Sequence, residues 1–406
     1  MTRYYSANEA SERLGVSRNT LYSYVSRGLI RSEPTAPKSK TCKYHALDVD
    51  RMVTNSGLYK TPAKALQGST AWGVPIMESA ITMIDTETFY YRGHCVPVLA
   101  LEQSFEEVLT ILWGKSDKQP TVPDSSLQRI ADNALKQRSG NSTVDLFLHV
   151  LAQLNHADVR TYSFSRESTI SAGVMMISSF LRILTGRWSA RRIAEQLTEV
   201  WQLDHSLAQL IDSALILVAD HELNISTFTA RCTASAGCSP YAAVAAATHA
   251  FWGRRHGGNT ERIRGLFDEA YGKGSLYEAI KSRMKRGEAL PGFGHKLYDE
   301  DPRSRFLLSR IPDTRGYMAQ TFEALEKLPG LSYPTVDFAL VVMEKELSLP
   351  ERSGSFLFYL GRLAGLVAHI MEQYAENQPI RPRAKYTGAI PAKNEIAGLA
   401  VQALTA

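Results

Sequence analysis

The chain has 406 residues, of which 44% are hydrophobic and 21% are charged. This length and composition suit two or three folded domains and exclude an intrinsically disordered protein. The net charge of +5 is confined to the first sixty residues, where ten Lys or Arg face five Asp or Glu, while the rest of the chain carries 36 of each sign. A basic end on a neutral body is typical of a separate module with a polyanionic partner, although a solvated terminal segment has the same charge.

Residues 1–56 have the pattern of a helix-turn-helix. Ser6 and Glu9 are placed as a capping box that starts a short helix, Ser17 caps a second helix, and Gly28 is placed to end it. The small core is expected to consist of Leu14, Val16, Leu21, Val25, Leu29 and Ile30. The outer face of the second helix would carry Arg18, Asn19, Tyr22, Ser23 and Arg27. A helix-turn-helix needs such a face to lay its second helix in a major groove.

This segment resembles the N-terminal reading head of MerR-type regulators, including a later helix start at residues 47–50. The resemblance implies DNA binding through the outer-face residues Arg18, Asn19, Tyr22 and Arg27. The alternative is a module that only packs on the body or builds an assembly. Residues 32–40 are predicted to be a polar loop inside the module, and residues 57–71 a linker.

From residue 72 onward the chain is predicted to be almost entirely helical, which makes the fold class all-α. Long amphipathic stretches are separated by Gly, Pro and Ser, and no strands alternate with helices as a parallel sheet requires. Residues 232–253 contain no Asp, Glu, Lys or Arg, but Gly237 and Pro240 interrupt them before the roughly 20 residues that a membrane span needs. We therefore expect buried helices there and no membrane protein. The N-terminus shows no secretion signal, and the four cysteines are expected to be reduced thiols of a cytoplasmic protein.

The second half of the sequence gathers histidines and arginines at Gly-rich turns. In chain order the motifs are Asp220–Ser226, Arg255–Asn259, Pro291–Tyr298, Asp301–Arg303, Thr335–Phe338, Phe358–Arg362 and Arg381–Gly388. His221 and Asn224 are expected at i, i+3 on one helical face, and the two glycines after His256 allow close backbone approach. His249 and His369 fall on apolar helical faces and are expected in the core or behind a site.

These residue types favour chemistry on a small polycarboxylate. A guanidinium grips a carboxylate bidentately, and a histidine can polarise a carbonyl or stabilise an enolate oxygen. Desolvation can raise the pKa of Asp337, bounded by Val and Phe, from about 3.9 towards that of a useful base. A ketodiacid that condenses with an activated acyl carbon needs this set. No metal is implied, because the histidines lack a spacing such as His-x-x-x-His.

In order and spacing, these motifs are similar to those of citrate synthases over roughly residues 72–390. The segments Tyr91–His94 and Ser104–Val108 also resemble that family's opening. The chain departs from the family at Arg255, where Leu is usual, and at Lys296, where Arg is commoner. The resemblance implies an all-α homodimer whose two helical domains close over the substrates. They would comprise a large domain at residues 72–254 and 363–406 and a small domain at residues 255–362.

The resemblance also assigns residues to oxaloacetate. His221 and His295 would hold this substrate, with His295 polarising its ketone. Arg303 and Arg362 would bind its carboxylates, and Arg381 would reach in from the partner subunit.

A second set of residues would serve the acyl-CoA. His256 would stabilise the enol oxygen of the thioester, and Asp337 would remove the proton from its α-carbon. Lys296 would meet CoA phosphates. CoA enters as a co-substrate, so no permanently bound cofactor is expected.

Three functions stay open at this point. The first is citrate formation from acetyl-CoA, and the second is 2-methylcitrate formation from propionyl-CoA. One methylene is worth only about 1–3 kcal/mol in an apolar pocket, so the sequence does not separate them. The third is a DNA-binding regulator that senses oxaloacetate or acyl-CoA.

Overall fold

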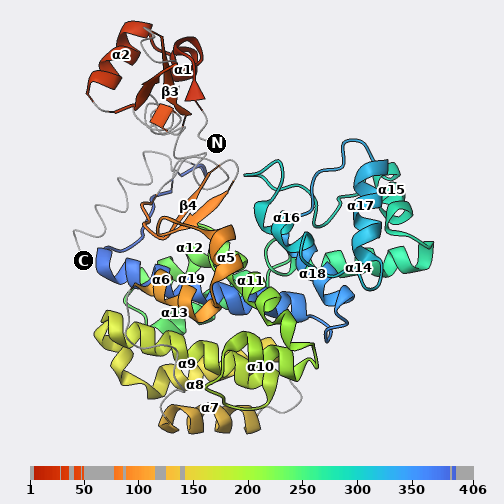
Figure 1. The fold of residues 1–406 in the computed structure, drawn as a ribbon. Helices are drawn as coiled ribbons and strands as arrows, with labels where there is room; N and C mark the ends of the chain where they lie inside the picture. Colours follow the sequence, from red (N-terminus) through yellow and green to blue (C-terminus); the bar gives the residue numbers. More distant parts are fainter. Residues whose placement is uncertain are drawn as a thin grey trace, which may run out of the picture. The chain divides into compact units, whose positions relative to one another are not determined.

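The computed structural model describes residues 4–27, 29–35, 41–46, 48–49, 77–85, 88–114, 125–137, 142–384 and 386–389. The chain divides into two compact units, Met1–Glu78 and Ser79–Ala406, and Figure 1 labels most of their helices and two of their strands, β3 and β4. The predicted linker at residues 57–71 and the predicted helix end at Gly28 lie outside the described residues. The boundaries between a large and a small helical domain stay a prediction.

The first unit combines two helices with a small antiparallel sheet. Its elements are β1 (Tyr4–Tyr5), α1 (Ala7–Leu14), α2 (Arg18–Ser26), β2 (Ser32–Pro34) and β3 (Cys42–His45). The strand order is β1-β3-β2, with Tyr4 opposite His45 and Ser32 opposite Tyr44. The prediction of a polar loop from residue 32 was wrong at its start, because residues 32–34 pair with β3. Pro34 is tolerated there because β2 is an edge strand.

The predicted N-terminal caps of both helices in this unit are confirmed. Ser6 N donates to Glu9 Oε2 at 2.7 Å, and Glu9 N donates to Ser6 Oγ at 3.3 Å, which completes the capping box. Ser17 caps α2 by accepting from Thr20 N. Leu29 was wrongly assigned to the core, since it is 51% exposed while its neighbour Ile30 is buried. The sheet supplies Tyr5 and Tyr44 to the core instead.

The second unit opens with another three-stranded antiparallel sheet, which the sequence reasoning did not predict. It consists of β4 (Thr82–Ile84), β5 (Phe89–Tyr91) and β6 (His94–Cys95). Arg92 and Gly93 have φ of 46° and 88°, as a tight two-residue hairpin turn requires. Phe89 and Tyr91 are fully buried, so the sheet is part of the core of this unit.

The rest of the second unit is helical, and the all-α fold class is confirmed. Its helices are α5 (Val96–Glu102), α6 (Phe105–Trp113), α7 (Ser125–Gln137), α8 (Thr143–Ala157), α9 (Arg166–Thr185), α10 (Ile193–Val200), α11 (Ala208–Val218), α12 (Ile225–Ser235), α13 (Pro240–Phe251), α14 (Asn259–Lys273), α15 (Leu276–Lys285), α16 (Pro302–Leu308), α17 (Tyr317–Lys327), α18 (Val336–Glu346) and α19 (Ser353–Glu376), with 3-10 turns η1 (Val159–Ser163) and η2 (His205–Leu207). In Figure 1, α14, α15 and α17 lie together to one side, and α18 links them to α19.

Helix α19 is the central helix of this unit and packs against α6, α9, α11, α12, α13 and α18. A Cβ on Gly361 would lie 2.5 Å from Leu215 O, and one on Gly365 would lie 2.4 Å from Ala219 O, so only glycine permits the close approach to α11 and the residue after it. Helices α9 and α19 are long and apolar enough to cross a membrane, but 61% and 89% of their most apolar windows are buried inside the structure. They are core helices by this measure.

Candidate active site

His221 lies in a short loop between α11 and α12, not on a helical face as predicted. Helix α11 ends at Val218, and Glu222, in the loop that follows, has φ of 52°. Asn224 is the N-cap of α12 and accepts from Thr227 N at 3.1 Å. His221 and Asn224 therefore do not share a helical face, contrary to the prediction from their i, i+3 spacing.

His221, His295 and Tyr298 form one cluster, although 77 positions separate His221 from Tyr298. His221 Nε2 lies 3.0 Å from Tyr298 Oη. The ring centroids of His221 and His295 are 5.4 Å apart, and those of His295 and Tyr298 are 5.0 Å apart. Tyr298 closes the same Pro291–Tyr298 motif as His295, but the sequence reasoning gave it no role.

Both histidines of this cluster are neutral. Burial, with added repulsion from Arg303, lowers the pKa of His295 to about 4. Burial, followed by the positive charges of Arg303, His295 and Arg362, lowers the pKa of His221 well below its usual value. His295 Nδ1 accepts from the backbone N–H of Leu297 at 3.2 Å, so the proton of the neutral ring is on Nε2.

Arg303 and Arg362 are both buried, with different partners. Arg303 donates from Nε and Nη2 to Asp301 at 2.9 and 2.8 Å, and Asp301 also accepts from Val336 N at 3.0 Å. Arg362 donates from Nε to Val218 O at 2.9 Å. That carbonyl is the one hydrogen-bond partner of the Arg362 guanidinium within the described part of the chain. Its remaining N–H groups are placed to serve an anion, because a buried guanidinium requires acceptors.

Asp337 lies in the first turn of α18. Burial, together with the nearby charge of Asp301, raises its pKa to about 6 although Arg303 opposes the shift. Thr335 Oγ1 makes only a long contact of 3.4 Å with Asp337 Oδ2. A carboxylate with a pKa near 6 is a competent general base at neutral pH.

His256 lies in the turn between α13 and α14 and is also neutral. Burial, followed by the charge of Arg362, lowers its pKa to about 3. Its Nε2 lies 2.8 Å from Ser226 Oγ, and its ring packs against Phe251 with centroids 5.0 Å apart. A Cβ on Gly257 would lie 2.2 Å from Phe251, so the predicted need for glycine after His256 is explained.

Shared contacts place these groups in one site: Asp301 binds both Arg303 and the N–H of Val336, the residue before Asp337, and Phe358 lies beside both the His256 ring and the Arg362 guanidinium. The charge of Arg362 acts on His221 and His256, and the charge of Asp337 acts on Arg303 and Arg362. Lys296 and Arg381 are exposed. Their roles toward CoA and toward a partner subunit stay predictions.

His249 and His369, which were expected in the core or behind the site, differ in burial. His369 is fully buried, with its Nε2 3.2 Å from Asp220 Oδ2, next to His221. His249 is exposed on α13, so its placement in the core was wrong. Its neighbours Ala247 and Thr248 face the core instead.

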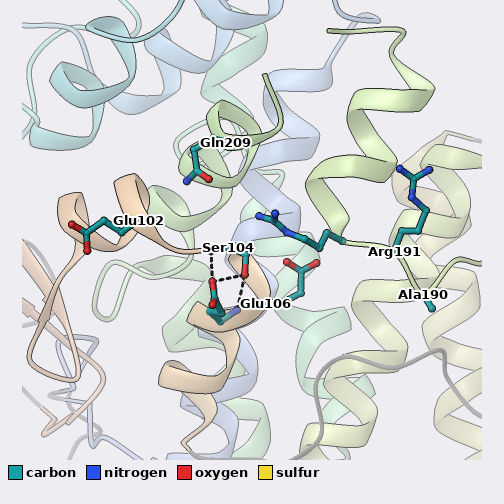
Figure 2. Close-up of a pocket in the computed structure, with 8 residues that line it drawn as sticks. Glu102, Ser104, Glu106, Ala190, Arg191 and Gln209 are labelled. Atoms are coloured by element: carbon teal, nitrogen blue, oxygen red, sulfur yellow. Dashed lines mark hydrogen bonds between the residues drawn. The ribbon is translucent and has the colours of Figure 1, made fainter. Parts of the chain in front are cut away.

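A separate hollow of about 380 Å³ lies at the other end of α11 from the histidines (Figure 2). Its lining residues are Glu102, Ser104, Glu106, Glu107, Ala190, Arg191, Arg192 and Gln209. Glu107 is held in a capping box with Ser104, Arg191 pairs with Glu199 at 2.7 Å, and Arg192 pairs with buried Asp212. This hollow contains none of the histidines and is not the candidate active site. Among the described residues, no group of three or more His, Cys, Asp or Glu could hold a metal ion.

Comparison with known proteins gives two family matches. Residues 70–383 match the family described as "Citrate synthase, C-terminal domain", and residues 4–56 match "Helix-turn-helix domain". The citrate synthase of Haloferax volcanii is 28% identical over 357 residues, covering 78% of this chain and 94% of the relative. A citrate/2-methylcitrate synthase of Bacillus subtilis is 35% identical over 191 residues, covering 44% and 51%.

A solved structure has the same fold. It is the ternary complex of carboxymethyl coenzyme A and oxaloacetate with citrate synthase from Thermoplasma acidophilum. It is 22% identical to this chain, with a TM-score of 0.64, and the match covers 79% of this chain and 96% of that one.

Proposed function

This chain belongs to the citrate synthase family of acyltransferases, and we propose that it condenses acetyl-CoA with oxaloacetate and water to give citrate and CoA. The proposal rests on one observation: neutral His221, His295 and His256 and the base Asp337 share a site with two buried guanidiniums. That combination provides for both halves of a condensation between a ketodiacid and a thioester.

Oxaloacetate would occupy the side of the site formed by the paired histidines. The N–H groups of Arg362 that no described residue uses would bind one carboxylate, and Arg303, held by Asp301, would bind the other. His295 carries its proton on Nε2, which makes that atom a donor for the ketone oxygen. A neutral donor aimed at the oxygen stabilises the alkoxide that forms there.

The thioester would be activated between Asp337 and His256. Asp337, ionised above a pH of about 6, takes a proton from the α-carbon. Because Ser226 occupies Nε2 of His256, Nδ1 is the atom available to the enol oxygen. The enol carbon then forms a bond to the ketone carbon of oxaloacetate, and water releases CoA from the resulting thioester.

Propionyl-CoA is the alternative acyl donor, and a relative named citrate/2-methylcitrate synthase supports keeping it. A thiol-release assay with oxaloacetate and a series of acyl-CoAs tests the proposal. We expect release that depends on both substrates, with acetyl-CoA the better donor. Absence of release with every acyl-CoA would refute the condensing function.

We propose a homodimer in the cytoplasm, in which Arg381 of each copy completes the partner's oxaloacetate site. Two observations support this role of Arg381. Its side chain is exposed, and within one chain no hydrogen bond or ion pair joins it to a described residue. Lys296 is likewise exposed and would meet CoA phosphates.

The first unit supports a second activity, DNA binding. Arg18, Asn19, Tyr22 and Arg27 are all exposed on or just after α2, and Tyr22 is 49% exposed. Arg18 is oriented by a hydrogen bond from its Nε to Asn8 Oδ1 at 3.0 Å. The basic charge of the segment suits phosphate contacts. A gel shift against genomic fragments tests this activity. It also tests the hypothesis that the whole chain is a DNA-binding regulator.

A further inference from the structure

The carboxylate of Asp220, the residue before His221, is held from two elements. Thr82 Oγ1 of β4 and His369 Nε2 of α19 both contact Oδ2, the latter at 3.2 Å. Burial would raise the pKa of Asp220, but the interaction with His369, the positive charge of Arg362 and the hydrogen bond from Thr82 outweigh it and hold the pKa below its usual value. The carboxylate is therefore ionised and accepts both hydrogen bonds.

The backbone around Asp220 is fixed as well. Its N–H donates to Tyr91 Oη of β5 at 3.0 Å, and Tyr91 is fully buried. On the other side, a Cβ on Gly365 would lie 2.5 Å from Asp220 Oδ1, so α19 already touches this carboxylate. The aspartate has little room to move in either direction.

His369 also lies near the start of the second unit. Its Nδ1 lies 3.8 Å from Glu372 Oε2, and Glu372 Oε1 accepts from Ala80 N at 2.8 Å. The distance of 3.8 Å is too long for a hydrogen bond, so the direct link from β4 is the one between Thr82 and Asp220. That hydrogen bond ties the first strand of the unit to the loop that presents His221.

We propose that His369 is a positioning residue for the oxaloacetate site, which fixes His221 by holding Asp220 together with Thr82. Arg362 lies seven residues earlier on the same helix, and both side chains are buried on the side facing this loop. The His369–Asp220 contact therefore sets the distance between the Arg362 guanidinium and the His221 imidazole. These two groups must bind the same ligand. The inference rests on the proposed function, because it takes oxaloacetate as that ligand.

The test compares oxaloacetate affinity in variants of the full chain. His369→Leu removes the donor and should raise the KM and the dissociation constant for oxaloacetate roughly tenfold or more. The KM for acyl-CoA and kcat should stay within about twofold. His369→Gln returns an N–H near the position of Nε2 and should restore most of the affinity.

A double-mutant cycle with Thr82→Val adds a readout that a general loss of stability would not give. Both substitutions act on one carboxylate, so their effects on oxaloacetate affinity should be non-additive. Thr198→Val is the matched control, since the buried Thr198 hydroxyl bonds, among the described residues, only to its own helix at Ala194 O, 2.7 Å away. This control should leave the affinity unchanged.

A lowered melting temperature with unchanged oxaloacetate affinity in His369→Leu would overturn the inference. If His369→Leu fails to fold, Thr82→Val and His369→Gln test the inference in its place. An unchanged oxaloacetate affinity in Thr82→Val would overturn the inference. Oxaloacetate binding is measured by calorimetry as well as by turnover. If the wild-type protein binds oxaloacetate without turnover, the condensing function is refuted, but the affinities of the variants can still be compared. If the wild-type protein neither binds nor turns over oxaloacetate, both the condensing function and the role of His369 are refuted.

Discussion

Ser226 Oγ lies 2.8 Å from His256 Nε2, and the same hydroxyl lies 2.7 Å from Asn224 Oδ1. One hydroxyl proton can serve only one of these two acceptors. When Ser226 donates to Asn224, the neutral His256 ring keeps its proton on Nε2. When Ser226 donates to His256, the ring proton moves to Nδ1, where an enol oxygen requires it. The proposed role of His256 therefore requires the arrangement in which Ser226 donates to Nε2.

Ser226→Ala should therefore lower kcat roughly tenfold or more, because Nε2 loses the donor that keeps the ring proton on Nδ1 in that arrangement. The KM for oxaloacetate should change little. Ser171→Ala is the control, since the Ser171 hydroxyl is exposed and bonds to its own helix at Glu167 O. Steady-state kinetics on both variants check the prediction, and an unchanged kcat in Ser226→Ala would remove the serine from this role.

Arg362→Leu should mainly weaken oxaloacetate binding. The buried guanidinium has one carbonyl partner among the described residues, so its other donors are the ones a substrate carboxylate would use. The loss of a charge-assisted contact should raise the KM for oxaloacetate roughly tenfold or more, with less effect on acyl-CoA. Arg182→Leu, at a partly exposed pair with Asp132, is the control. A rise in the KM for acyl-CoA alone would contradict the assignment.

The pH dependence of kcat/KM should report the ionisation of the general base, Asp337. Asp337 must be ionised to accept a proton, so kcat/KM should fall as pH drops through about 6, the raised pKa of this carboxyl. His256 has a pKa of about 3 and stays neutral across this range, so it adds no second acid limb. Rates measured between about pH 5 and 8 check this. A flat profile down to about pH 5 would show that the base has an ordinary pKa.

Deletion of residues 1–56 should abolish DNA binding and leave catalysis nearly intact, because every proposed catalytic and substrate residue lies beyond position 220. Binding by the full chain should weaken steeply with salt, and Arg27→Ala should weaken it further at every ionic strength. Gel shifts run beside light scattering separate this from an assembly role. No shift at low salt, with a changed oligomer mass on deletion, would refute DNA binding.

The sequence predicted the residues of the candidate site better than their local structure. His221, His256, His295, Arg303, Arg362 and Asp337 all fall in the motifs that were singled out, and the structure brings them together. The helical face expected for His221 was wrong, because α11 ends at Val218 and the chain then runs through a loop with a left-handed backbone at Glu222. Periodicity alone gives no sign of such an interruption.

The missed features depend on contacts between distant segments or on very short elements. Tyr298 meets His221 across 77 positions, and Thr82 meets Asp220 across 138, which a single sequence does not reveal. Strands of two to four residues are too short to show an alternating pattern. Leu29 and Ile30 are equally apolar neighbours, and only the fold decides which of them faces the core.

The central claim is that Asp337 removes the α-proton of the thioester, and Asp337→Asn tests it most directly. The substitution keeps the shape of the side chain and removes its basicity. Thiol release at saturating oxaloacetate and acetyl-CoA should fall roughly 100-fold or more relative to the wild type, while calorimetry shows that oxaloacetate still binds. Near-normal turnover in purified Asp337→Asn protein would contradict the account.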